Sequence, residues 1–279
     1  MPRLALLAIA ALTLAGCAAT PTVDDGRLQV VASTNVYGSI AALIGQDGVT
    51  ITSLIHTAAQ DPHSFEASAR DQLAVSKADL VIENGGGYDD FVDTLLDAAS
   101  SDAVVINAAE VVALPDGANE HLWYDLSAMS TVADEIVAQL SDLDPANAAV
   151  YDANGRGFVE ALDGIRESVD GVGDGQTVAI TEPVPLYLLE SAGFENVTPD
   201  EFSEAIEEGT DVSPVVLKNT LAAVGGAALL AYNSQTASPE TEQLHAAAED
   251  AGVPVVEFTE TLPDGEDYLS WMTANAAAL

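Results

Sequence analysis

Short apolar runs alternate along this chain with segments whose apolar residues recur at helical spacing. A run of four to eight aliphatic residues between polar ones predicts a strand, and apolar residues three and four positions apart predict a helix. Strands are therefore predicted at residues 28–35, 49–55, 79–84, 103–107, 177–181, 227–232 and 255–258, and helices at 36–44, 68–78, 88–99, 186–192 and 241–251. This alternation predicts an α/β fold with mainly parallel sheets and with ligand loops at the carboxyl ends of strands.

The middle of the chain has a different pattern. Residues 127–171 carry almost no strand signal and have apolar residues at helical spacing, with an interruption near Pro145. We interpret them as two helices, the second of which is long enough, at roughly 36 Å, to link two lobes. The predicted organisation is an N-terminal α/β lobe at 28–144, a connecting helix at 145–170 and a C-terminal α/β lobe at 171–279.

The N-terminus has the layout of a secretory signal. The apolar run Leu4–Leu14 is followed by Ala15, Gly16 and Cys17, the only cysteine of the chain. Small residues directly before a cysteine resemble the lipobox of bacterial lipoproteins, although a signal peptide that merely contains a cysteine remains an alternative. We expect a signal peptide at 1–16 and a lipidated tether at 17–27, with Cys17 anchoring the protein to the extracytoplasmic face of the cell membrane.

The chain is strongly acidic, with 45 aspartates and glutamates against seven lysines and arginines and a formal net charge of −38. Repulsion from phosphates excludes nucleic acid as a partner. The negative field concentrates cations without distinguishing among them, so most of these carboxylates are interpreted as a solvated surface. Adaptation to high salt, which screens this repulsion, is a further hypothesis.

Four histidines are present: His56, His63, His121 and His245. His63 follows Pro62 in a loop after a predicted strand, and His121 precedes the helical middle of the chain. No local metal motif such as His-x-x-x-His occurs. On spacing alone, a loop histidine is more often a surface residue than a metal ligand.

Several segments together resemble one protein family. These are Val31–Thr34, Asp61–Glu66 with Arg70-Asp71, Lys77–Val81 and Tyr268–Asn275. They are similar to the signature of the substrate-binding proteins of zinc and manganese ABC importers, the cluster A-I family, over nearly the whole mature chain. The resemblance implies two α/β lobes joined by a long helix, a metal ion bound between them, and delivery of that ion to a membrane permease. It implies no catalysis, and we expect a monomer.

The resemblance also places four metal ligands: His63, His121, Glu182 and Glu260. His121 stands in Glu120–Trp123, where the family more often has Asp-Pro-His-x-Trp, and Glu260 replaces the usual aspartate. Two imidazoles and two carboxylates suit a divalent transition metal. Zinc and manganese both qualify as the transported ligand, and the residue types do not separate them.

Three alternatives remain open at this point. A zinc-dependent extracytoplasmic hydrolase would also use histidine and glutamate ligands, but it would need an open coordination position and a nearby base. A protein that binds a metal chelate would need more aromatic or basic residues than this chain has. The third alternative is a surface adhesin, because relatives have been described as adhesins.

Overall fold

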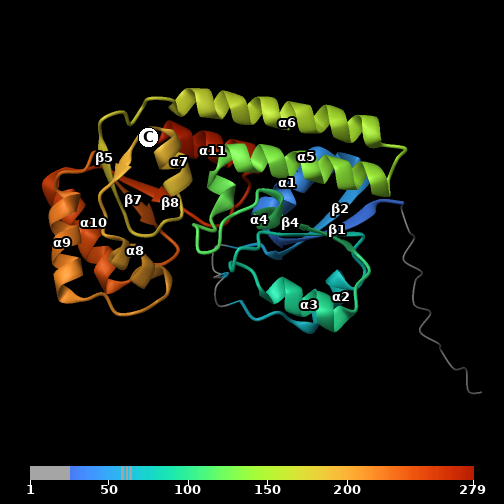
Figure 1. Cartoon of the computed structure of the whole chain (residues 1–279), viewed down its shortest axis with the longest axis horizontal. Helices are drawn as coiled ribbons and strands as arrows, with labels where there is room; N and C mark the ends of the chain where they lie inside the picture. Colours follow the sequence, from blue (N-terminus) through green and yellow to red (C-terminus); the bar gives the residue numbers. More distant parts are fainter. Residues whose placement is uncertain (1–25, 58–59, 61, 63–64) are drawn as a thin grey trace, which may run out of the picture.

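The computed structural model describes residues 26–57, 60, 62 and 65–279. Cys17 and His63 lie outside the described residues. The chain forms two α/β lobes, each built on a four-stranded sheet (Figure 1), with strand orders β2-β1-β3-β4 and β6-β5-β7-β8. All strand pairings among the described residues are parallel.

The first lobe carries helices on both faces of its sheet. Its elements are β1 (Leu28–Thr34), α1 (Asn35–Gly45), the 3₁₀ turn η1 (Gln46–Gly48), β2 (Val49–Ile55), α2 (Ala69–Val75), β3 (Leu80–Glu83), α3 (Phe91–Ala99), β4 (Val104–Asn107) and α4 (Ala108–Val111). All four residues of β3 are buried, as expected for a central strand covered on both faces. Val75 of α2 and Leu95 of α3 pack under one face, and Ile40 of α1 belongs to the core on the other.

The second lobe repeats this arrangement. Its elements are β5 (Thr177–Ile180), α7 (Leu186–Ser191), β6 (Glu195–Asn196), α8 (Asp200–Glu207), α9 (Pro214–Val224), β7 (Leu229–Asn233), α10 (Pro239–Ala251), β8 (Val255–Phe258) and α11 (Tyr268–Ala277). Phe202 of α8, Val224 of α9 and Leu244 of α10 form a core over one face of the second sheet. This layer holds α8 firmly, which matters for the site described below.

One long helix connects the lobes. After the 3₁₀ turn η3 (Leu122–Tyr124), α5 (Leu126–Leu143) leads to α6 (Ala148–Val169), which carries the chain from the first lobe to the second (Figure 1). Asp125 caps α5 by accepting hydrogen bonds from the backbone N–H groups of Ser127 and Ala128 at 2.9 and 3.0 Å. At Gly155 a Cβ atom would lie 2.4 Å from a methyl carbon of Val137, so glycine lets α5 and α6 pack closely.

The two lobes share one continuous apolar core. A single cluster of buried residues includes Val30 of the first sheet and Val178 of the second, joined through α5, α6 and α11. Asn35 exchanges two hydrogen bonds with the backbone of Leu262, at 3.0 and 3.1 Å, across the same boundary. Because of this shared core, we expect the lobes to unfold together. Within the described residues, no helix has the length and apolarity that a membrane span requires.

Candidate metal site

His121 lies at the boundary between the lobes, in the loop that leads into η3. Its side chain is 1% exposed, and it packs edge-on against the ring of Trp123 at 5.1 Å. The backbone N–H of His121 donates to Asn119 Oδ1 at 3.1 Å, and ring atom Nδ1 lies 2.7 Å from the same oxygen. One side chain therefore sets both the backbone and the ring orientation of His121.

The hydrogen bonds of Asn119 determine which ring nitrogen of His121 faces the site. Asn119 Nδ2 donates to the backbone carbonyl of Pro183 at 2.9 Å, so the amide oxygen is the atom that faces His121. An amide oxygen only accepts, so Nδ1 carries the proton, and Nε2 of the neutral ring keeps its lone pair. Nε2 is thus the nitrogen that would coordinate a metal, while the hydrogen bond at Nδ1 fixes the ring orientation, as is common at metal-binding histidines.

Glu182 and Glu260 lie at the carboxyl ends of strands of the second sheet. Glu182 follows β5, Glu260 follows β8, and both are buried, at 3% and 4% exposure. The Asn233 side-chain amide, at the end of β7, donates to Oε2 of Glu182 and to Oε1 of Glu260, the latter at 3.0 Å. Thr236 donates a further hydrogen bond to Glu182 Oε2 at 2.5 Å. The parallel sheet therefore gathers two carboxylates at the edge where ligands of such sheets bind.

Tyr88 connects this carboxylate pair to the first lobe. Its hydroxyl donates to Glu260 Oε2 at 3.3 Å, and its ring lies edge-on to His121 with centroids 5.9 Å apart. Burial, and then the negative charge of Glu260, raise the pKa of Tyr88 well above its usual value, so it stays a neutral donor. Tyr88 thus connects His121 to Glu260, and Asn233 connects Glu260 to Glu182, but among the described residues the group of ligand atoms that includes His121 contains neither Glu182 nor Glu260.

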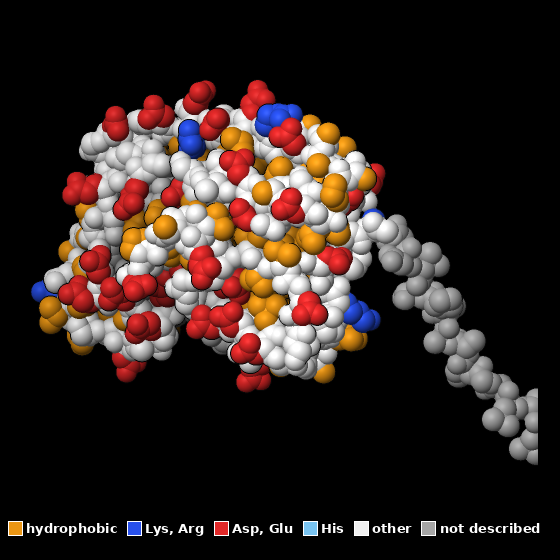
Figure 2. Space-filling model, turned by 45° about the vertical axis from the view of Figure 1, so that its right-hand side comes forward, with side chains coloured by type: hydrophobic (Ala, Val, Ile, Leu, Met, Phe, Trp, Pro, Cys, Tyr) orange, Lys and Arg blue, Asp and Glu red, His pale blue; other side chains and the backbone are white. Residues whose placement is uncertain are grey.

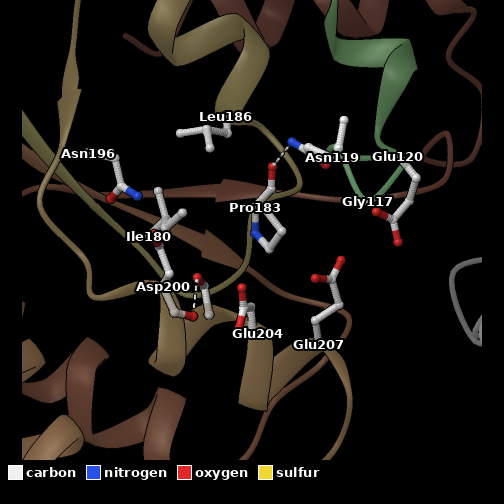
Figure 3. Close-up of a pocket in the computed structure, with 12 residues that line it drawn as sticks. Gly117, Asn119, Glu120, Ile180, Pro183, Leu186, Asn196, Asp200, Glu204 and Glu207 are labelled. Atoms are coloured by element: carbon white, nitrogen blue, oxygen red, sulfur yellow. Dashed lines mark hydrogen bonds between the residues drawn. The ribbon is translucent and has the colours of Figure 1, made fainter. Parts of the chain in front are cut away.

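A cavity of about 200 Å³ opens beside the loop of Asn119 and Glu120, which precedes His121 in the chain (Figure 3). It is lined by Gly117, Ala118, Asn119, Glu120, Ile180, Pro183, Leu186, Asn196, Asp200, Ser203, Glu204 and Glu207. In Figure 3 the carboxylates of Glu120 and Glu207 face each other, one from each side of the cavity. Ligand atoms of Glu120, His121 and Glu207 all lie within 4.8 Å of one another, so the three side chains could hold one metal ion.

The pKa of the Glu207 carboxyl group is strongly shifted in this environment. Burial, and then the negative charges of Glu120, Glu182 and Glu260, raise its pKa from 4.5 to about 8. The metal-free site therefore concentrates negative charge that disfavours ionisation of Glu207. A bound divalent cation would relieve this repulsion.

The sequence reasoning did not identify Glu207. In a chain with 45 acidic residues, no single glutamate stands out by composition. A usable signal was present in Phe202 and Ile206, which are spaced four apart in a short amphipathic helix that ends at Glu207. Their burial determines which way the end of α8 faces.

The other histidines lie elsewhere or outside the described residues. His63, one of the four expected ligands, is not described. His56 is exposed, with Nδ1 3.3 Å from the Leu54 carbonyl. His245, on α10, lies 3.9 Å from Glu249 and packs against the ring of Tyr232, so neither His56 nor His245 joins the cluster around His121.

Comparison with known proteins identifies the family. The family model described as ZnuA, zinc-uptake complex component A periplasmic, matches residues 30–279. The chain belongs to this family. The two-lobe arrangement described above is therefore that of a member of a zinc-uptake component family.

Individual relatives agree with this assignment. The chain is 30% identical over 217 residues, covering 74% of it and 72% of the relative, to the manganese-binding lipoprotein MntA of Halalkalibacterium halodurans. It is 25% identical over 300 residues, covering 98% and 95%, to the manganese ABC transporter substrate-binding lipoprotein ScaA of Streptococcus gordonii. A solved structure of the substrate-binding protein FpvC of Pseudomonas aeruginosa with Mn²⁺ superposes with a TM-score of 0.72 at 25% identity, covering 90% of this chain and 96% of that one.

Proposed function

We propose that this protein captures one divalent transition metal ion, zinc or manganese, outside the cytoplasmic membrane and delivers it to an ABC importer. His121, Glu182 and Glu260, together with His63, would bind the ion between the two lobes. The membership of the family and the names of its relatives support a role in capture and transport rather than in catalysis.

One observation about the site carries most weight. Carboxylates from different parts of the chain converge beside a buried imidazole, and burial, followed by repulsion from the neighbouring carboxylates, raises the pKa of Glu207 to about 8. Like charges gathered in a partly buried site destabilise the fold unless a cation balances them. A divalent ion supplies that balance and can accept the lone pair of His121 Nε2.

The ligand chemistry of the site suits both zinc and manganese. Imidazole nitrogen suits zinc, and carboxylates shift preference toward manganese, while affinity for a given site still rises from manganese to zinc. The name of the family model refers to zinc uptake, whereas the names of two relatives refer to manganese. Both ions are therefore retained as cargo.

The setting of the protein is part of the proposal. Lipidation of Cys17 would anchor a monomer to the extracytoplasmic face of the membrane, with the segment before residue 28 as tether. The lipoprotein names of the relatives support this location. Its partner would be the permease of an ABC importer, which must distort the site to release the ion.

Calorimetric titration of zinc and of manganese into the metal-stripped protein tests the proposed function. The wild type should bind one equivalent of ion, and His121→Ala should lose at least tenfold in affinity. His245→Ala is the matched control, because that histidine lies on α10 away from the cluster. Equal affinities in wild type and His121→Ala would overturn the site, and no binding of either ion would overturn the function.

The alternatives from the sequence gain no support. The comparisons point to binding components of importers, which favours neither a zinc-dependent hydrolase nor an adhesin. Zinc-dependent turnover of model esters would revive the hydrolase.

A further inference from the structure

Glu207 is not among the four expected ligands, yet it lies close to the ring nitrogen of His121 that would bind a metal. Its Oε1 atom is 3.5 Å from His121 Nε2. Asn119 holds Nδ1 on the other side of the His121 ring, so Nε2 faces Glu207. Glu207 therefore approaches the atom through which His121 would bind an ion.

The separation of these two atoms fits two ligands of one ion. Nitrogen and oxygen ligands lie about 2.0–2.2 Å from a transition metal, so neighbouring ligands are roughly 3.4 Å apart at tetrahedral angles and roughly 3.0 Å apart at octahedral angles. The observed 3.5 Å matches the first spacing and needs a shift of about 0.5 Å to reach the second. Glu120 faces Glu207 across the cavity and completes the cluster of ligand atoms within 4.8 Å (Figure 3).

The surroundings of Glu207 Oε1 differ from those of the other buried carboxylates. Glu182 and Glu260 accept hydrogen bonds from Asn233, whereas Glu207 Oε1 is buried and accepts no hydrogen bond from any residue that the structure describes. A buried acceptor normally has a donor or an ion as partner. Phe202 and Ile206, packed in the second-lobe core, hold the end of α8 in place, so the carboxylate is presented from a rigid element.

We propose that Glu207 is an additional ligand of the transported ion and makes the site more favourable to manganese than the four expected ligands alone. This inference rests on the proposed function. Zinc is usually coordinated by four ligands in a tetrahedron, whereas manganese prefers oxygen ligands in an octahedral shell of six. An extra carboxylate therefore benefits manganese more than zinc.

The test compares dissociation constants for zinc and manganese in the wild type, Glu207→Gln and Glu208→Gln. Glu208 is the next residue, is also a glutamate and is exposed, so its substitution reports the effect of a nearby carboxylate that does not bind the ion. Charge alone acts equally on two divalent ions and leaves the zinc-to-manganese selectivity ratio unchanged. Direct coordination changes that ratio.

We expect Glu207→Gln to weaken manganese binding at least tenfold, and zinc binding by a smaller factor, while Glu208→Gln leaves the ratio as in wild type. X-ray absorption of the wild type should also show more oxygen ligands around manganese than around zinc, a readout that needs no variant. Equal losses for both ions in Glu207→Gln, or no loss, would overturn the role of Glu207 while the proposed function stands. Wild-type protein that binds neither ion would instead refute the function itself.

Discussion

Replacing Asn119 by alanine is the sharpest test of how the site is organised. The substitution removes the acceptor that holds His121 Nδ1 at 2.7 Å and the His121 backbone N–H at 3.1 Å. It also removes the hydrogen bond from Asn119 Nδ2 to the Pro183 carbonyl, which crosses between the lobes. The imidazole is then free to change its tautomer and to rotate.

The expected loss follows from these contacts. Removing a group that orients a metal-binding histidine typically weakens metal affinity by about 10–100-fold. That range corresponds to about 1.4–2.7 kcal/mol of binding free energy. We expect Asn119→Ala to fall within it for zinc, measured by calorimetric titration of the metal-stripped protein.

Two control variants separate the effect of orienting His121 from the effect of the hydrogen bonds between the lobes. Asn119→Asp keeps an oxygen for His121 Nδ1 but loses the donor to Pro183, so it should bind zinc at least as tightly as wild type. Tyr187→Phe removes a different bond between the lobes, from the tyrosine hydroxyl to the Asn119 carbonyl at 2.6 Å, and leaves His121 untouched. Wild-type affinity in Asn119→Ala would refute the reasoning, as would an equal loss in Tyr187→Phe.

Three further predictions concern pH and salt. Metal affinity should fall as pH is lowered through about 6.5, because imidazole ligands must be deprotonated to bind; titrations at pH 5.5 and 7.5 with equal affinity would argue against histidine ligands. Burial, and then the charge of Asp89, raise the pKa of Glu83 from 4.5 to about 7, so the folded state binds more protons than the unfolded state and stability falls as pH rises through this window. This shift in the pKa of Glu83 corresponds to at most about 3 kcal/mol in the free energy of unfolding. Glu83→Gln, which keeps an acceptor for Asn107, should therefore gain stability over wild type in urea unfolding at pH 8 but not at pH 4; an equal gain at both would count against this. Because the net charge is −38, the melting temperature of the metal-free protein should rise between about 0.01 and 1 M salt, and a flat profile would contradict the self-repulsion argument.

Much of the fold could be predicted from local patterns. The run Leu80–Glu83 is buried on both faces, and such unbroken apolar runs are the signal of a central parallel strand. The break near Pro145 separates α5 from α6, because proline and the polar residues around it interrupt a helical pattern. The α/β class, the two lobes and the family were confirmed by the structure and the comparisons.

Short elements could not be predicted in the same way. β6 comprises only Glu195–Asn196, and α8 covers Asp200–Glu207, both too short for a periodic signal to stand out. Their positions depend on packing against distant residues of the second lobe. The continuous core between the lobes also depends on such long-range contacts, in which Trp271 of α11 joins the cluster that contains Val30.

The site was only partly accessible from the sequence. His121, Glu182 and Glu260 were placed by resemblance, and the structure brings them to one region, while the complete ligand set with His63 stays a prediction. Glu207 escaped notice because its role depends on where α8 packs, not on any local motif. Its 3.5 Å approach to His121 exists only in the folded chain.

Elemental analysis of protein purified without chelators shows directly whether the protein holds a transition metal ion. We expect one equivalent of zinc or manganese per chain in the wild type and a large loss of metal in His121→Ala. Wild-type protein that carries no stoichiometric transition metal, and takes up none when either ion is supplied, would contradict this expectation.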